Sequence, residues 1–409
     1  MQLAQRLTFG GLGCADLCEE AHRATMTPLA TGLLSHFAAA ASSSQCEPRQ
    51  IATLLGGVAS VCRGPMSARL SRFADRAAHA VLSLPAAAFL PLAGRRPRID
   101  GQRLTPRMQF LANGAKRGLM ATADPPTAMQ LALFERLQRA AALARIDDAS
   151  RRDLTVRGGD GEPRRARLYE PARLPEDPGL AVFVHGGGWQ VGSIEAYDGV
   201  CAYLAKAAQV KVLALEYRLS WEARFPAAFE DVVAGFVDAV DRASELGVAR
   251  NRIAILGDSA GGNLAAAAAL LLGADRTYRP RLAALIYPAL DANLDRYEST
   301  RLFNAPLGRR IVERDMRRYA PAEVDRRDPR FSVMAAPEIS EMPRTYIASA
   351  GMDVLRDQAE AFGERLNGSG VEVEVQRFSN LPHGFFGMFV DSAARSATEA
   401  IALAIGQRI

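Results

Sequence analysis

The chain has 409 residues, of which 49% are hydrophobic and 23% are charged. It is therefore long enough to bury one large core or two ordinary ones, and its composition is that of a soluble globular protein. Of the net charge of +5, most lies in the first hundred residues, which hold ten arginines and six acidic residues. The nearly neutral remainder argues against a nucleic-acid-binding face on the main body.

The cysteines and the apolar runs indicate the cellular compartment in which the protein is expected. Five cysteines, an odd number, indicate reduced thiols rather than a disulfide framework. The N-terminal sequence lacks the basic segment and long apolar core of a secretory signal. The most apolar run, residues 80–94, is shorter than the roughly 18 residues that a membrane span needs and contains two prolines. We therefore expect a soluble, cytoplasmic protein without a transmembrane segment.

The first hundred residues predict a helical N-terminal extension. They are rich in alanine, and apolar residues from Leu70 to Leu84 recur at helical spacing. Three prolines between residues 85 and 97 then indicate a linker. Our first interpretation is a helical addition that is either solvated or packed on the cap. The alternative is an arm that interacts with an anionic surface or a partner.

One helix face in this extension carries potential metal ligands. Cys14, Cys18 and His22 recur every four residues, so their side chains would point the same way on a helix. Structural zinc sites usually have four ligands with closer cysteine spacing. We therefore expect no metal site.

Two further helical patterns cover residues 104–120 and 127–145, and the pattern changes after residue 150. Short β-rich runs then alternate with helical stretches, among them residues 225–246, 260–272 and 356–368. The β-rich runs read DLTVRG, RARLYEP, LAVFVHG, KVLALEY, IAILGDS, LAALIYP, RTYIASA and VEVEVQRF. The middle runs are continuously apolar, as in strands covered on both faces. This alternation predicts an α/β fold with a mostly parallel central sheet.

A candidate nucleophile lies between one of these strands and a helix. Residues Gly257, Asp258, Ser259, Ala260 and Gly261 form the G-x-S-x-G pattern of a nucleophile elbow. Such an elbow is a strained turn, and side chains two positions either side of the serine would crowd its backbone. The following helix N-terminus also favours developing negative charge. The pattern predicts Ser259 as the nucleophile, supported by the two glycines and the aspartate.

A glycine-rich turn after another apolar strand is a candidate oxyanion hole. It reads His185, Gly186, Gly187, Gly188 and Trp189, and it lacks the Lys-Ser/Thr ending of a phosphate-binding loop. A flexible turn is the simpler interpretation of glycines taken alone. With a serine elbow downstream, we expect the backbone N–H groups of Gly187 and Gly188, together with that of Ala260, to bind an ester oxygen. His185 and Gly186 would support the loop.

These motifs resemble the hormone-sensitive-lipase-like group of α/β-hydrolase esterases over residues 102–409. The similarity also rests on the segments EYRLSWEARFPAAFED at 216–231, AGMDVLRD at 350–357 and PHGF at 382–385. The order and spacing of the motifs are similar to those of that group. The resemblance implies Ser259 as nucleophile, Asp353 as acid and His383 as base, in a capped α/β-hydrolase fold that requires no cofactor.

The residues themselves support this assignment. The chain order in α/β-hydrolases is serine, acid, histidine, and His383 is the only histidine after Ser259. Asp353 follows a β-rich run, at the strand end where such sheets place ligands. Asp357 is a competing acid within the next helical stretch, and His185 is an alternative base that we interpret as support for the oxyanion loop.

The chain departs from the family pattern at two places. Val354 replaces the usual proline after the acid, which is a mild change. Ser220 and Trp221 replace the usual Ala-Pro in a loop that helps support the catalytic face. This second change bears on the shape of the pocket and on the substrate rather than on the triad.

We predict a helical extension over residues 1–100 and an α/β-hydrolase catalytic domain over residues 101–409. A helical cap would comprise residues 102–148 and 292–340, because the second segment is too long for a simple connection. The predicted activity is hydrolysis of small-molecule esters with short to medium acyl chains by a serine carboxylesterase. An amidase or formamidase with the same triad, and a non-catalytic small-molecule receptor, are the alternatives. The exact acyl and alcohol groups and the oligomeric state stay open, and a homo-oligomer is compatible with the sequence.

Overall fold

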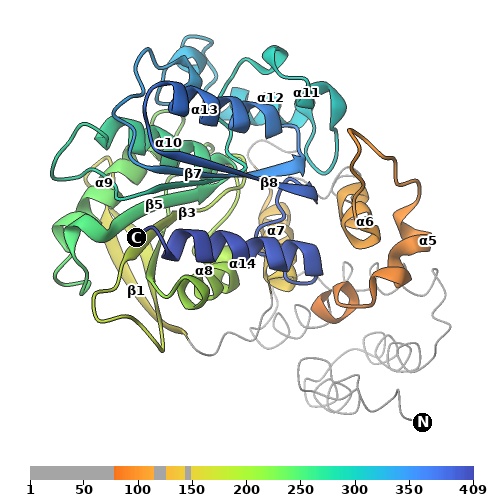
Figure 1. Cartoon of the computed structure of the whole chain (residues 1–409), viewed down its shortest axis with the longest axis horizontal. Helices are drawn as coiled ribbons and strands as arrows, with labels where there is room; N and C mark the ends of the chain where they lie inside the picture. Colours follow the sequence, from red (N-terminus) through yellow and green to blue (C-terminus); the bar gives the residue numbers. More distant parts are fainter. Residues whose placement is uncertain (1–77, 115–125, 143–148) are drawn as a thin grey trace.

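An eight-stranded sheet forms the centre of the protein (Figure 1). The computed structural model describes residues 78–114, 126–142 and 149–409. The strands are β1 (Ala149–Arg157), β2 (Pro163–Pro171), β3 (Leu180–Val184), β4 (Lys211–Leu215), β5 (Ile253–Asp258), β6 (Ala283–Ile286), β7 (Thr345–Met352) and β8 (Val373–Pro382). Their order is β1-β2-β4-β3-β5-β6-β7-β8. β2 pairs antiparallel with β1 and β4, and all other neighbours are parallel.

Helices cover both faces of this sheet, which explains the continuously apolar central strands. The helices are α5 (Leu90–Ala93), α6 (Pro106–Gly114), α7 (Ala128–Ala141), α8 (Ile194–Ala208), α9 (Ala227–Asp241), α10 (Ala260–Leu272), α11 (Ser299–Leu302), α12 (Arg309–Tyr319), α13 (Arg356–Gly368) and α14 (Ser392–Gly406). Side chains of α9, α10 and α13 form one core with one face of the sheet. α8 and α14 lie on the other face of the sheet (Figure 1), and their side chains form the core there.

The described end of the N-terminal region is tied to the body by a buried arginine. The guanidinium of Arg107, on α6, donates hydrogen bonds to the backbone carbonyls of Leu84 and Val390 and lies 3.8 Å from the carboxylate of Asp391. Nearby, Nδ1 of His79 donates to the carbonyl of Ala140 over 2.9 Å. Four segments far apart in the sequence therefore meet at one place.

The structure confirms the α/β fold and the mostly parallel sheet. Each of the eight β-rich runs overlaps a strand, and α10 and α13 have the predicted bounds. α9 ends at Asp241, earlier than predicted, because turns occupy the following residues. The cap and the domain boundary stay predictions; residues 102–148 contain α6 and α7, and residues 292–340 contain α11 and α12.

The metal and membrane predictions are tested only in part. No helix within the described ranges is long and apolar enough to cross a membrane. Over the same ranges, no group of three or more His, Cys, Asp or Glu side chains is placed to hold a metal ion. The candidate ligands Cys14, Cys18 and His22, and the start of the apolar stripe at Leu70, lie outside the described residues.

Candidate active site

Ser259 occupies a sharp turn between β5 and α10. Its backbone has φ 55° and ψ −117°, a conformation that an L-residue rarely adopts. The flanking glycines permit this turn because the chain passes close to the neighbouring strand. A Cβ on Gly257 would lie 2.4 Å from the carbonyl oxygen of Gly261, and a Cβ on Gly261 would lie 2.1 Å from that of Val184. The local backbone therefore requires the glycines that the sequence provides.

His383 connects this serine to a buried aspartate. It follows the last residue of β8, and its Nε2 lies 2.9 Å from Oγ of Ser259. Its Nδ1 lies 2.7 Å from Oδ2 of Asp353, which directly follows β7 and is 1% exposed. The other oxygen of Asp353 accepts a hydrogen bond from the backbone N–H of Leu355 over 3.0 Å. The ring of Tyr287 packs 4.7 Å from the imidazole and restricts its position.

The competing acid and base have other partners. Asp357 lies on α13, where its carboxylate accepts the N–H of Ser299 over 2.7 Å and pairs with Arg356. His185 is 2% exposed. Its Nδ1 lies 2.9 Å from the carbonyl oxygen of Gly186, and its ring stacks on that of Tyr217 at 4.4 Å. Both residues thus hold local structure near the site, away from the serine hydroxyl.

The glycine-rich turn presents free backbone donors beside this serine. Gly187 and Gly188 adopt φ values of 125° and 61°, so side chains are disfavoured there. A Cβ on Gly187 would lie 2.0 Å from the carbonyl oxygen of Val191. Among the described residues, none accepts a hydrogen bond from the N–H of Gly187, Gly188 or Ala260. Ala260 is also the first residue of α10, whose N-terminus carries partial positive charge.

Asp258 holds the glycine-rich turn next to Ser259 by a hydrogen bond. Its Oδ1 accepts the N–H of Gly186 over 2.8 Å, and its Oδ2 accepts the hydroxyl of Tyr197 over 3.1 Å. Tyr287 approaches the same oxygen at 3.4 Å. Burial raises the pKa of the Asp258 carboxyl above its ordinary value, while these hydrogen bonds oppose that shift. The residue before Ser259 thus fixes the glycine-rich loop that faces this serine.

The segment that holds the Ser-Trp departure contacts the residues that follow the glycines, and of its two hydrogen bonds only that of the Trp221 side chain depends on the departure. The backbone N–H of Ser220 donates to the carbonyl of Trp189 over 2.7 Å. The indole N–H of Trp221 donates to the carbonyl of Gln190 over 3.0 Å. Two hydrogen bonds therefore hold the chain immediately after the glycines. Val354, the other departure, is fully buried, and its carbonyl accepts the hydroxyl of Ser299 over 3.0 Å.

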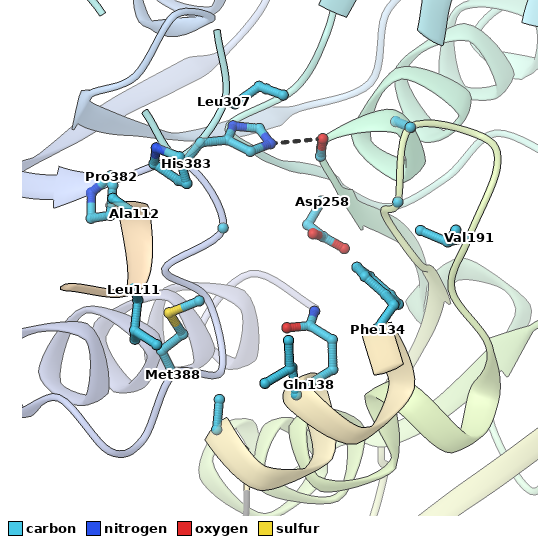
Figure 2. Close-up of a pocket in the computed structure, with 18 of the residues that line it drawn as sticks. Leu111, Ala112, Phe134, Gln138, Val191, Asp258, Leu307, Pro382, His383 and Met388 are labelled. Carbon is cyan, nitrogen blue, oxygen red and sulfur yellow. Dashed lines mark hydrogen bonds between the residues drawn. The ribbon is translucent and has the colours of Figure 1, made fainter. Parts of the chain in front are cut away.

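A cavity of about 430 Å³ opens at Ser259 and His383. Figure 2 shows Leu307 on one side of His383 and Leu111, Phe134 and Met388 on the other. We call the side with Leu111, Phe134 and Met388 the α6–α7 side; its apolar lining residues also include Leu82, Met108, Leu137 and Ala141. We call the side with Leu307 the α12 side; it is also lined by Trp189, Pro306, Val312, Arg314 and Asp315. A two-part ligand could therefore place one part on each side of the serine.

Several residues at this site were missed from the sequence. Tyr197 and Tyr287 contact Asp258, and Tyr287 also packs on His383. Tyr197 lies in α8, and Tyr287 directly follows β6. The sequence around each tyrosine does not distinguish it from an ordinary core residue. Asp315 and Gln190 were missed as well, and Asp315 lies on the buried face of α12.

Comparisons with known proteins agree with the fold. Residues 181–387 match the family model described as the alpha/beta hydrolase fold. A carboxylic ester hydrolase, LipN, from Mycobacterium tuberculosis is 34% identical over 73% of this chain and 81% of its own length. The ethyl acetate hydrolase of Pseudomonas putida is 35% identical over 62% of this chain and 80% of its own. The crystal structure of a hyperthermophilic esterase from Pyrobaculum calidifontis covers 73% of this chain and 97% of its own, with 30% identity and a TM-score of 0.66.

Replacing Gly261 with alanine tests the packing of the turn. The added Cβ would lie 2.1 Å from the carbonyl oxygen of Val184 and 2.5 Å from that of His185. We expect the free energy of unfolding to fall by about 2 kcal/mol or more, because backbone must move to admit the methyl group. Chemical denaturation measures the effect. Gly368→Ala is the matched control, since its Cβ meets no atom within 4 Å, and an equal loss in both variants would contradict the prediction.

Proposed function

The chain belongs to the α/β-hydrolase fold family and, within it, to the hormone-sensitive-lipase-like group of carboxylic ester hydrolases, and we propose that Ser259, His383 and Asp353 are its catalytic triad. One observation carries the proposal. Ser259 Oγ lies 2.9 Å from Nε2 of His383, and Nδ1 of the same ring lies 2.7 Å from Oδ2 of Asp353. A nucleophile, a base and an orienting acid are thus in hydrogen-bond contact in that order.

The hydrogen bonds determine the direction of proton transfer. A carboxylate only accepts, so Nδ1–H of His383 donates to Asp353 and leaves Nε2 to accept the hydroxyl proton of Ser259. Oγ then attacks the ester carbonyl, and the carbonyl oxygen becomes an oxyanion. The N–H groups of Gly187, Gly188 and Ala260 would stabilise that charge; losing one such donor typically costs about 10²–10³ in rate.

Collapse of the tetrahedral intermediate releases the alcohol. His383 donates its new proton to the leaving alkoxide, and the acyl group stays on Ser259 as an ester. The same histidine then takes a proton from water, which attacks the acyl-enzyme. The carboxylic acid leaves and Ser259 is restored. Asp353 stabilises the imidazolium in both halves of the cycle and keeps the ring in the required tautomer.

The cavity suggests how an ester lies in the site. Its α6–α7 side is mostly apolar, with Arg136 and Gln138 as polar residues of α7 that also line the cavity, and we assign the acyl chain to this side. Its α12 side includes Arg314 and Asp315 and suits the alcohol portion. Its volume of about 430 Å³ falls within the usual range for small-molecule pockets, roughly 300–1,000 Å³. We therefore propose short- to medium-chain acyl esters as substrates. Ala78 and Leu82 also line the cavity, and the hydrogen bond from Arg107 to the carbonyl of Leu84 holds this segment in place.

Hydrolysis of p-nitrophenyl esters from acetate to palmitate tests the proposed reaction. We expect the highest kcat/KM at acyl chains of roughly four to eight carbons, because longer chains exceed the enclosed site. Ser259→Ala should lower kcat by about 10⁴-fold or more, since the acyl-enzyme cannot form. The exposed Ser369→Ala is the control and should retain activity.

Other outcomes of this assay separate the alternatives. A maximum at palmitate would instead indicate a lipase that acts on long chains. Turnover of p-nitroanilides but not of the esters would indicate an amidase. No turnover of either substrate would favour a receptor, and a ligand-binding screen would then follow.

Asparagine substitutions at the two aspartates test which one is the acid. Asp353→Asn should lower kcat by about 10⁴-fold, because an amide facing Nδ1 favours the wrong tautomer of His383. Asp357→Asn should keep kcat near the wild-type value, since its carboxylate contacts Ser299 and Arg356 instead. Steady-state kinetics on the preferred p-nitrophenyl ester measures both. A larger loss for Asp357→Asn would overturn the assignment.

Leu82 tests the proposed acyl site, because it is 4% exposed and lines the α6–α7 side of the cavity. Leu82→Trp should lower the octanoate-to-acetate ratio of kcat/KM by about tenfold, since the larger ring fills space that the longer chain needs. Leu82→Ala should shift the optimum toward longer chains. Acetate hydrolysis serves as the internal reference, and Leu403→Trp, at a half-exposed position on α14, is the control. Identical chain-length profiles in all variants would place the acyl chain elsewhere.

A further inference from the structure

α12 carries an aspartate on its buried face. Val312, Met316 and Tyr319 are the apolar residues of that face, and Asp315 lies among them with only 7% of its surface exposed. A buried carboxylate is costly unless hydrogen bonds or a charged partner compensate for the lost water. Each of its two oxygens therefore needs a hydrogen-bond donor.

One oxygen of Asp315 is satisfied by the protein. Oδ1 accepts a hydrogen bond from Nε2 of Gln190 over 2.7 Å and another from Nε of Arg314 over 2.8 Å. Burial raises the pKa of the Asp315 carboxyl, and the charge of Arg314 and these hydrogen bonds oppose that shift. The carboxylate is thus held in one orientation.

The second oxygen has no protein donor. Within the described part of the chain, no group donates a hydrogen bond to Oδ2 of Asp315. This oxygen lies beside the proposed oxyanion hole, since a Cβ on Gly188 would be only 2.7 Å from it. Asp315 also lines the cavity that contains Ser259 and His383. A nearly buried acceptor therefore faces the place where a substrate binds.

We propose that Oδ2 of Asp315 accepts a hydrogen bond from a hydroxyl group on the alcohol portion of the substrate. The preferred substrates are then monoesters of a diol or polyol rather than esters of simple alkanols. This inference rests on the proposed ester hydrolysis and on the placement of the alcohol portion on the α12 side. We place the alcohol portion beside this oxygen because Oδ2 lies next to Gly188, one of the proposed oxyanion donors.

The charges around Asp315 favour a neutral donor over a charged one. Arg314 already pairs with Oδ1 and also lines the cavity, so an ammonium group on the ligand would meet a nearby positive charge. Arg318, which donates to Gln190 over 2.7 Å, adds a second positive charge near Asp315. A carboxylate has no hydrogen to donate to Oδ2, so it cannot satisfy this acceptor. A hydroxyl group satisfies the acceptor without adding charge to a mostly apolar cavity, and hydrogen bonds to charged acceptors are among the stronger ones in proteins.

Two butyrate esters of equal size test the proposal. 2-Hydroxyethyl butyrate and propyl butyrate differ only in the replacement of a methyl group by a hydroxyl group, and both form the same butyryl-enzyme. Titration of released butyric acid gives kcat/KM for each. A purely apolar site would favour the propyl ester, because it would have to desolvate the hydroxyl group. We expect the wild type to favour the hydroxyethyl ester by about tenfold or more.

For each variant we compare the kcat/KM for 2-hydroxyethyl butyrate with that for propyl butyrate. The ratio of the two values cancels any general effect of the mutation on the oxyanion loop. Asp315→Leu should lower the ratio by about 10- to 100-fold, because the acceptor is lost. In Asp315→Asn, Gln190 and Arg314 would hold the amide oxygen at the Oδ1 position, so an NH2 group would replace the acceptor at Oδ2. A hydroxyl group can still accept a hydrogen bond from that NH2, and the ratio should be intermediate. Glu313→Gln, which alters an acidic residue on the same helix that pairs with Arg309, should retain the wild-type ratio.

The outcomes distinguish this inference from the proposed function. Hydrolysis of both esters with a wild-type ratio of one or less would overturn the role of Asp315 and leave the triad intact. A ratio that is unchanged in Asp315→Leu would do the same. Failure of the wild type to hydrolyse these esters and p-nitrophenyl butyrate would instead overturn the proposed ester hydrolysis.

Discussion

The site depends on one buried carboxylate, that of Asp258. β3 and β5 are parallel neighbours, and their register pairs Val184 with Gly257, so the oxyanion loop and the serine turn leave the sheet side by side. Sheet pairing alone brings the two loops close but does not orient them. The hydrogen bond from the N–H of Gly186 to Asp258 does so, because the aspartate is covalently next to Ser259.

This carboxylate costs free energy to bury, and its surroundings show how the fold offsets that cost. Tyr197 from α8 donates a hydrogen bond to it, and Tyr287, directly after β6, lies near the same oxygen. Hydrogen bonds to a buried charge are stronger than those between neutral groups, and leaving such a charge without partners is more costly still. The strained backbone at Ser259 is therefore held by contacts to three neighbouring elements rather than by its own conformational preference.

The sequence locates the residues of the candidate site better than the contacts that support them. Ser259 and the surrounding glycines are recognisable because a strained turn and a close backbone approach admit few residue types. The strands are recognisable because burial on both faces leaves continuous apolar runs. Tyr197 could not be assigned, because its role depends on a tertiary contact with Asp258. Asp315 did leave a signal, since an aspartate at the apolar positions of an otherwise amphipathic helix contradicts the pattern.

The residues after the glycines connect the oxyanion loop to α12. Trp221 holds the backbone carbonyl of Gln190, and the side chain of Gln190 donates to Asp315. The loop is thus fixed from the sheet by Asp258 and from α12 by Gln190. A ligand group that binds Asp315 would act on a residue already hydrogen-bonded to this loop, so recognition of the alcohol portion and placement of the oxyanion donors share one set of contacts. Gln190 and Asp315 would thus affect both the binding of the alcohol portion and the geometry of the loop. We therefore expect substrate selectivity and rate to change together when the hydrogen bond between these two residues is altered.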